Sequence, residues 1–261
     1  MTATIAAGPF ILAAIDGTQS EDYMTGGNVS SVLKFHNNFK VSGGSSVKKY
    51  WQGPDILGVD VRTPLSPVTY AVCTIPKLKE AACRGVHGLA ASATRWIVSE
   101  HAKLTDPQVV LVGHSRGGLI CIDVAKRLMS RGIDVFFMGL YDAVDMAAGM
   151  DGSTIPSTVQ NVYHAMRDPG LGSRRLWGNA GKQVSSSTDH NSQHFWGTHG
   201  SIGGAPDAAC KKGDLVETPI VGYAVPGDEC KTDLTASRNR NARILANNYV
   251  VAGARSVGLP V

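Results

Sequence analysis

The sequence predicts an α/β protein with a mostly parallel, doubly wound sheet that is flanked by helices. Two observations indicate this fold class. Short apolar runs recur along the chain without polar alternation, as in strands that are buried on both faces of a parallel sheet. Between these runs lie longer segments with apolar residues at helical spacing. Strands that alternate with helices form parallel sheets, because each return connection crosses a face of the sheet.

Length and composition favour one folded domain over residues 1–261. Hydrophobic residues make up 43% of the chain and charged residues only 18%, which suits a large core and argues against long disordered segments. The net charge is +4, but the basic residues are scattered, so we expect no nucleic-acid partner. No apolar run reaches the roughly 20 residues of a membrane-spanning helix, and the N-terminus lacks the basic start of a signal peptide. We therefore expect a soluble protein that is cytoplasmic or exported by a signal-independent route.

The predicted elements follow from these patterns. Strands are expected at 10–15, 109–112, 135–140 and 159–166, and a short strand in 193–204 opens into a glycine-rich loop around His199. Helices are expected at 28–39 with Asn28 as N-cap, at 86–101, directly after Ser115, and at 233–254. Ile244, Leu245 and Val251 are expected among the buried positions of the last helix.

The stretch Gly113-His114-Ser115-Arg116-Gly117 joins the strand ending at Val112 to the next helix. A serine between two glycines at such a junction is the nucleophile elbow of the α/β-hydrolase fold, in which side chains at the glycine positions would collide with neighbouring backbone. The turn exposes the serine hydroxyl at the carboxyl edge of the sheet, beside a helix N-terminus that favours developing negative charge. The alternative is a chance glycine-rich turn. The strand before the motif and the amphipathic helix after it favour the elbow.

A serine nucleophile needs a base, and histidine suits this role because its ordinary pKa lies near 6.5. In this fold the chain order is serine, acid, histidine, which disfavours the histidines before Ser115. His114 is expected to point away from the serine, and His164 to be a satisfied core histidine. Three candidates remain: His190, His194 and His199. We prefer His199, because it follows the last strand-like run and lies in a glycine-flanked turn.

The acid should follow a strand beyond the elbow helix. Asp142 ends the strand directly after that helix and is the first choice, and Asp168 at the end of the next strand is the alternative. Asp145 and Asp189 are weaker candidates. Each aspartate could instead be a helix N-cap or a turn residue.

The oxyanion of a tetrahedral intermediate needs hydrogen-bond donors. The backbone N–H of Arg116, directly after the serine, is one candidate. The loop Asp16-Gly17-Thr18 after the first strand offers the other, through the N–H of Gly17 or Thr18. The alternative for this loop is an ordinary turn.

The five cysteines lack the spacing of a zinc site, and we expect neither a metal nor a cofactor. Cys121 is predicted to be a small buried hydrophobe. Cys73 with Cys83, and Cys210 with Cys230, could each close a local loop in an oxidising compartment, or remain free thiols in a reducing one.

Taken together, these motifs resemble a family of bacterial and fungal α/β hydrolases whose best-known members are catalytic domains of type VI secretion phospholipase effectors. The family motifs D-G-T, N-V and G-F-S-R-G are similar to residues 16–18, 28–29 and 113–117. Its motifs W-D-T-V, H-A-x-x-x-D and G-x-H-S-D-V-G-G are similar to residues 141–144, 164–168 and 197–204. All six matches follow the same order and span most of the chain.

This resemblance implies that Ser115, Asp142 and His199 are nucleophile, acid and base, in agreement with the choice made from the residues. Two departures concern the substrate. Ser201 replaces the aspartate that follows the family's histidine, and the chain has little room for the insertions that form a membrane-facing module or lid. Residues 146–152, rich in Gly and Met, could form a mobile flap over the site, but an ordinary connecting loop is the preferred interpretation.

The sequence therefore predicts a serine hydrolase that cleaves carboxylic esters through an acyl-enzyme, such as a lipase-like or phospholipase-like esterase. Its partner would be a small-molecule ester or a lipid, with transient contact to a membrane surface in the second case. Acyltransferases and peptidases use the same triad. A catalytically silent hydrolase fold that binds a ligand is the alternative from another class.

Overall fold

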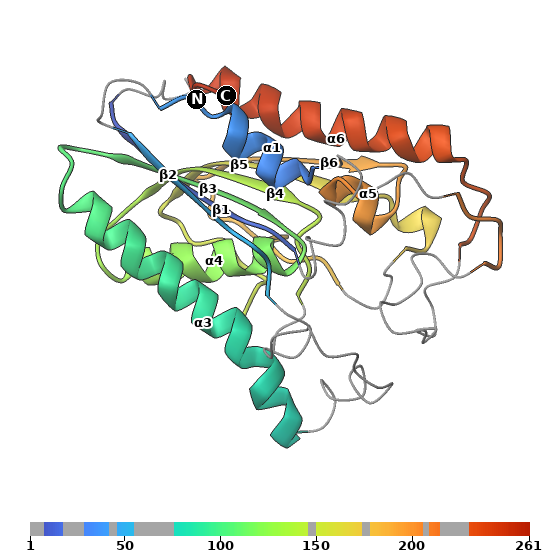
Figure 1. The fold of residues 1–261 in the computed structure, drawn as a ribbon, viewed down its shortest axis with the longest axis horizontal. Coiled ribbons are helices and arrows are strands. Elements are labelled where there is room, and N and C mark those ends of the chain that lie inside the picture. The colour runs from blue at the N-terminus through green and yellow to red at the C-terminus, as the bar shows by residue number, and fades with distance from the viewer. Residues whose placement is uncertain are drawn as a thin grey trace.

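A computed structural model describes residues 8–17, 29–41, 46–54, 76–145, 150–173, 178–205, 209–214 and 230–261, with only the backbone described in 76–84. In this part of the chain, six parallel strands form one sheet in the order β2-β1-β3-β4-β5-β6 (Figure 1). The strands are β1 (Phe10–Ile15), β2 (Val47–Trp51), β3 (Gln108–His114), β4 (Val135–Tyr141), β5 (Val159–Arg167) and β6 (Asp189–Phe195).

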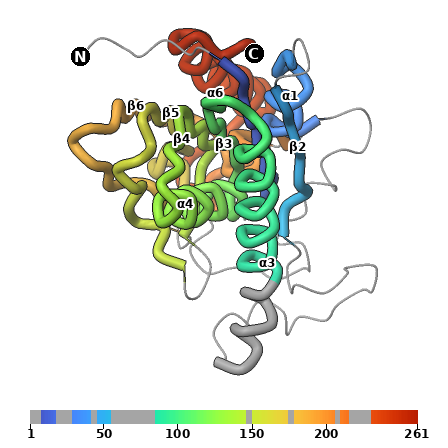
Figure 2. The backbone as a smooth tube through the Cα atoms, turned by 90° about the vertical axis from the view of Figure 1, so that its left-hand side faces the viewer, coloured from blue at the N-terminus to red at the C-terminus, as the bar shows by residue number. Residues whose placement is uncertain are grey.

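Helices cover both faces of this sheet. The helices are α1 (Ser31–Asn38), α3 (Pro76–His101), α4 (Arg116–Met129), α5 (His199–Gly203) and α6 (Ala236–Ser256). In Figure 1, α3 and α4 lie below the sheet and α1 and α6 above it, and Figure 2 shows the same layers after a quarter turn. Every residue of β1 and β4 is buried, because apolar side chains pack against helices on both faces. The chain has the predicted α/β-hydrolase fold.

The order of the strands determines where a site can form. From β1 the chain runs outward to β2, returns to the other side of β1 as β3, and then adds β4, β5 and β6 in sequence. The carboxyl ends of β1 and β3 are therefore neighbours at the point where the strand order reverses. Open α/β sheets bind their ligands at such a point.

Two predicted helices differ from the structure in their caps or faces. Helix α1 begins at Ser31, and the Ser30 hydroxyl caps it by accepting a hydrogen bond from the Leu33 N–H at 3.0 Å. The prediction of Asn28 as N-cap was therefore wrong, and Asn28 itself lies outside the described residues.

Helix α6 buries a different face from the one predicted. Ile244 and Leu245 are 47% and 56% exposed, and Val251 is only partly buried. The buried stripe consists mainly of small residues, Ala242, Ala246, Val250 and Ala254. Small side chains let the helix axis approach the sheet closely, and at Gly253 a Cβ atom would overlap the Tyr163 ring. Selecting the largest apolar residues as the buried ones was the error.

The region around His199 also differs from its prediction. Strand β6 begins at Asp189, before the predicted start at residue 193, and carries mostly polar, exposed residues. Apolar residues therefore indicated only the end of this strand. The segment after it is the short helix α5 rather than a glycine-rich loop. Helix α3 begins at Pro76, well before the predicted residue 86.

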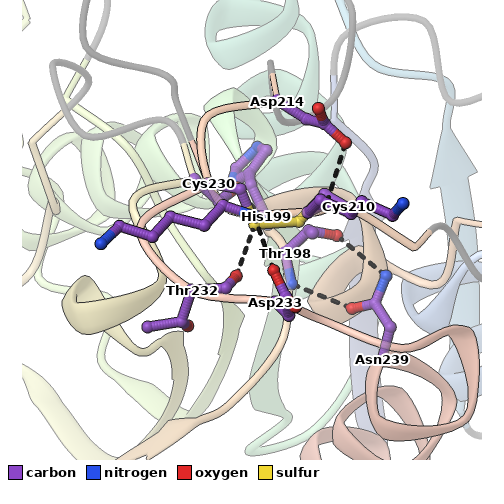
Figure 3. The surroundings of a disulfide bond; sticks show 11 residues. Thr198, His199, Cys210, Asp214, Cys230, Thr232, Asp233 and Asn239 are labelled. Atoms are coloured by element: carbon purple, nitrogen blue, oxygen red, sulfur yellow. Dashed lines mark hydrogen bonds between the residues drawn. A yellow bond between two sulfur atoms is a disulfide. The ribbon is translucent and has the colours of Figure 1, made fainter.

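A disulfide joins Cys210 to Cys230 beside Leu171 and Leu234 (Figure 3), so this pair does close a local loop. Cys121 is free and buried, as predicted. The prediction for Cys73 and Cys83 lies outside the described residues. No helix in the described ranges is long and apolar enough to cross a bilayer.

Candidate active site

Ser115 lies in a strained turn between β3 and α4. Its backbone has φ 55° and ψ −127°, a region that residues other than glycine rarely adopt. A Cβ atom on Gly113 would lie 2.6 Å from the Gly117 carbonyl oxygen, and one on Gly117 would overlap the carbonyl oxygen of Ile15. Both glycines are therefore required sterically, as expected for the elbow.

Three side chains form a hydrogen-bonded chain at the carboxyl edge of the sheet. The Ser115 Oγ lies 2.9 Å from His199 Nε2, and His199 Nδ1 lies 2.7 Å from Asp142 Oδ2. All three residues are buried, with 4% or less of their surface exposed. The structure thus brings together the predicted nucleophile, base and acid, which are far apart in the sequence.

Strand register explains the first half of this arrangement. His114 pairs with Tyr141 across β3 and β4, so Ser115 and Asp142 are the next residues on neighbouring strands. Asp142 also has a positive φ of 45°, and its N–H donates to the Ala165 carbonyl at 2.7 Å. The chain therefore turns sharply after both strands, and the two side chains remain at the sheet edge.

His199 is held at the N-terminus of α5. Thr198 caps this helix by accepting a hydrogen bond from the Ser201 N–H. The Thr198 N–H donates to Asn239 Oδ1 of α6 at 3.0 Å (Figure 3). The N–H of His199 itself donates to the Ser173 hydroxyl at 2.9 Å. These contacts fix the backbone from which the imidazole projects.

Arg167, at the end of β5, contacts the acid, although no sequence motif marks it for this role. Its Nη1 donates to Asp142 Oδ2 at 2.6 Å, and its backbone N–H donates to Asp142 Oδ1 at 3.2 Å. Burial alone would raise the pKa of Asp142, but the Arg167 guanidinium and the hydrogen bond with His199 hold that pKa well below its usual range. Asp142 is therefore ionised throughout the ordinary pH range.

His114 packs against the imidazole of His199. The two ring centroids are 4.9 Å apart, at an interplanar angle of 31°. A Cβ atom on Gly17 would lie 2.6 Å from His114 Nδ1, and one on Gly203 would overlap the His114 ring. The ring thus fills a slot that two glycines leave open. The expectation that His114 points away from the serine gave no indication of this contact with the predicted base.

His114 is buried and neutral. Burial lowers the pKa of His114 to about 3, and the neighbouring His199 contributes to this lowering. A neutral ring in this position does not repel a proton on His199.

Asp16, at the end of β1, is a buried hydrogen-bond acceptor near His114. Its carboxylate accepts hydrogen bonds from the hydroxyls of Ser30 and Tyr50, the second at 2.9 Å, and from the Gly17 N–H at 2.9 Å. Burial raises the pKa of Asp16 to about 6, although these hydrogen bonds oppose the rise. Asp16 thereby joins β1 to β2 and to the start of α1.

The hydrogen bond from Gly17 bears on the predicted oxyanion donors. The Gly17 N–H donates to Asp16 Oδ1 at 2.9 Å, so it would have to leave this acceptor in order to bind an oxyanion, and its predicted role stays a prediction. Thr18 lies outside the described residues. Arg116, directly after the serine, is the first residue of α4, at whose start the Gly118 N–H donates to the Ser115 carbonyl at 3.1 Å.

The alternative candidates lie elsewhere. Asp168 caps a 3-10 turn (Pro169–Leu171) by accepting from the Gly170 N–H at 2.7 Å, so Asp142 and not Asp168 contacts His199. Asp189 instead accepts a hydrogen bond from the side chain of Asn191. His164 accepts from the Ala143 N–H at 3.1 Å, as expected for a satisfied core histidine.

The remaining candidates for the base line a neighbouring cavity, and one segment considered in the sequence lies partly outside the described residues. His190 and His194 on β6 line a cavity of about 420 Å³ that also borders Arg167 and Ser173. Residues 146–149, part of the segment 146–152 that we interpret as a connecting loop with a flap as the alternative, lie outside the described residues. Within the described ranges, no cluster of three His, Cys, Asp or Glu residues could hold a metal ion.

No family model and no curated protein matches the chain. Solved structures similar to it include the Tle1 effector bound to the VgrG spike from the type 6 secretion system, at 15% identity and a TM-score of 0.48 over 77% of this chain. An uncharacterized protein from Pseudomonas aeruginosa is 13% identical, with a TM-score of 0.46 over 97% of this chain. The chain spans about half the length of these two proteins, 52% and 51%. An acetyl xylan esterase is 12% identical, with a TM-score of 0.37, and the match covers 97% of this chain and 100% of that one.

Proposed function

We propose that the protein is a serine hydrolase that cleaves carboxylic esters through an acyl-enzyme intermediate. The observation that carries this proposal is the continuous hydrogen-bonded chain from Ser115 through His199 to Asp142. The strained backbone of Ser115 supports it further, because strain of this kind concentrates at functional sites.

In the first half of the reaction, His199 Nε2 takes the proton of the Ser115 hydroxyl while the serine oxygen attacks the ester carbonyl carbon. The π electrons of the carbonyl move onto its oxygen, which becomes an oxyanion. When the carbonyl re-forms, the bond to the leaving oxygen breaks, and His199 returns the proton to that oxygen so that an alcohol departs. An ester between the acyl group and Ser115 remains.

Water then completes the cycle. His199 takes a proton from a water molecule, whose oxygen attacks the acyl carbon. When the second tetrahedral intermediate collapses, the bond from the acyl carbon to Ser115 Oγ breaks, His199 returns the proton to that oxygen, and the carboxylic acid leaves. Asp142 accepts the hydrogen bond from His199 Nδ1 throughout, which fixes the tautomer and stabilises the imidazolium. Its ionisation, favoured by Arg167, keeps it in the required acceptor state.

For the oxyanion, we infer two backbone donors, the N–H of Arg116 and the N–H of Thr18. The first lies at the N-terminus of α4, where the helix dipole also favours negative charge. Removal of one such donor typically lowers the rate about 10²- to 10³-fold.

The test is hydrolysis of short p-nitrophenyl esters by the wild type, by Ser115→Ala and by the control Ser130→Ala, which alters an exposed serine at the end of α4. We expect Ser115→Ala to lose at least about 10⁴-fold in kcat, while the control keeps its activity and both variants keep their circular dichroism spectra. Full activity in Ser115→Ala would eliminate the proposal. A hydrolase fold that only binds a ligand instead predicts no turnover by the wild type.

Within this class, the motif resemblance favours a lipid ester as the acyl donor, as in a lipase or phospholipase. Release of fatty acid from phosphatidylglycerol vesicles, measured beside the short esters, distinguishes the two substrate types. We expect this release to depend on Ser115 in the same way. Turnover of short esters alone would assign the chain to simple esterases.

A further inference from the structure

We propose that Arg167 is a positioning residue whose positive charge sets the pH range in which His199 can act as the base. This inference rests on the proposed function, since it concerns the same three side chains. It gives a role to the buried guanidinium of Arg167, which no sequence motif identifies.

Arg167 and His199 share one acceptor atom. Asp142 Oδ2 accepts from Arg167 Nη1 at 2.6 Å and from His199 Nδ1 at 2.7 Å. One carboxylate oxygen therefore interacts with both a permanent cation and the imidazole. Because Arg167 compensates the negative charge of Asp142, the carboxylate attracts a proton on His199 less strongly than an unpaired carboxylate would.

Burial makes this effect large. Arg167 and His199 are each 4% exposed, and Asp142 is fully buried. Water and salt ions therefore screen the three charges only weakly, unlike those of a surface ion pair.

The guanidinium is also held in place from its other side. Arg167 Nε donates to the Ser173 carbonyl at 2.8 Å, and the Ser173 hydroxyl accepts from the His199 N–H at 2.9 Å. Ser173 therefore links the backbone of the base to the partner of the acid. The charge of Arg167 keeps a fixed distance from both, as a role in setting the pH range requires.

Other titratable groups lie on the elements that carry the pair or pack beside it. In the described part of the chain they come from β1, β3, α4, β5 and β6: Asp16, His114, Arg116, His164, His190 and His194. Burial lowers the pKa of His114 to about 3 and that of His164 to about 4, so both are neutral near pH 7.

Asp16 Oδ1 lies 3.8 Å from His114 Nδ1, and the Asp16 carboxylate accepts its hydrogen bonds from Ser30, Tyr50 and the Gly17 N–H. Helices α1 and α6 present the neutral side chains of Ser31 and Asn239 to this region.

The direction of the effect follows from electrostatics. If the charge of Arg167 is removed, Asp142 attracts the imidazolium form of His199 more strongly. His199 then stays protonated to a higher pH, and a protonated imidazole cannot accept the serine proton. The low-pH limb of kcat/KM, which reports the free enzyme, must move to higher pH.

The experiment compares kcat/KM against pH for the wild type, Arg167→Gln, Arg167→Lys and the control Arg131→Gln, which alters an exposed arginine on the loop after α4. We expect Arg167→Gln to move the low-pH limb upward by about one unit, the effect of one nearby charge. Arg167→Lys and the control should leave the limb where it is in the wild type. An unmoved limb in folded Arg167→Gln, or an equal shift in Arg167→Lys, would overturn the proposal.

A second variant covers a failure of Arg167→Gln to fold. Arg167 borders the cavity of about 420 Å³, so Arg167→Ala should admit free guanidinium at millimolar concentration. Urea has the same shape without the charge and is the matched control. We expect guanidinium but not urea to return the low-pH limb towards its wild-type position, and equal effects of the two compounds would contradict the inference.

The two proposals fail in different ways. If the wild type neither hydrolyses esters nor depends on Ser115, the proposed function is wrong. If the wild type is active and its low-pH limb is independent of the charge at position 167, only the role of Arg167 is wrong.

Discussion

At the scale of single residues, the chemistry of the site depends on which buried groups are charged. Asp142 is held ionised by Arg167, whereas burial keeps His114 neutral. A positive charge on His114 would face the imidazolium that forms on His199 across a centroid distance of 4.9 Å. We therefore infer that the neutral His114 ring helps His199 to act as the base, because it packs against the imidazole without repelling a proton on it.

His114→Ala and His114→Phe test this support. Alanine removes the surface against which the His199 ring packs, so we expect the imidazole to lose its alignment and kcat to fall about 10²-fold, as small misplacements do. Phenylalanine retains a neutral ring and should keep kcat within a few-fold of the wild type. Ester hydrolysis measures both. Equal losses in the two variants would show that the ring nitrogens matter rather than the packing.

The residues that could be predicted from the sequence are those whose position a motif defines. Ser115 is fixed by its two glycines, and Asp142 and His199 by their places after strands in the expected chain order. Arg167 and the packing of His114 could not be predicted, because both depend on which side chains meet in three dimensions. A basic residue ending the strand after the acid's strand was the one available signal for Arg167.

At the scale of elements, the elbow depends on a close approach of β1, β3 and α4. The carbonyl of Ile15, the last residue of β1, occupies the space that a side chain at Gly117 would need. Helix α4 can therefore begin in contact with the end of β1 only with glycine at this position.

Gly117→Ala and Gly88→Ala should change stability in opposite directions. The first forces a methyl group against backbone, and we expect it to lower the free energy of unfolding by about 3 kcal/mol. Gly88 lies in α3, is exposed, and has no atom within 4 Å of the position that an alanine methyl group would take. There alanine should raise the free energy of unfolding by about 0.5–1 kcal/mol through helix propensity. Urea denaturation measures both changes. An unchanged free energy of unfolding in Gly117→Ala would contradict the steric account.

Elements buried on both faces were the most predictable. Strands β1, β3 and β4 carry nearly continuous apolar residues, and their predicted bounds differ from the observed ones by at most two residues. Strand β6 lies at the edge of the sheet with a polar sequence, so hydrophobicity could not mark its start. Helix α6 packs through alanines, and only the tertiary contact identifies that face.

At the scale of the whole molecule, the sheet brings together groups from distant parts of the sequence. Ser115 follows β3, Asp142 follows β4, and His199 begins the helix after β6. Their contact exists only when the strands are in register and α5 packs against Asn239 of α6. The reactivity of Ser115 should therefore belong to the folded chain and not to its local sequence.

Labelling with a fluorophosphonate probe, followed by intact-mass analysis and peptide mapping, tests this claim most directly. The activated serine oxygen displaces fluoride from the probe, so we expect one adduct per folded chain, on Ser115. Ser115→Ala and urea-unfolded wild type should both remain unlabelled. A folded wild type that gains no adduct, or gains it on another residue, would contradict the account.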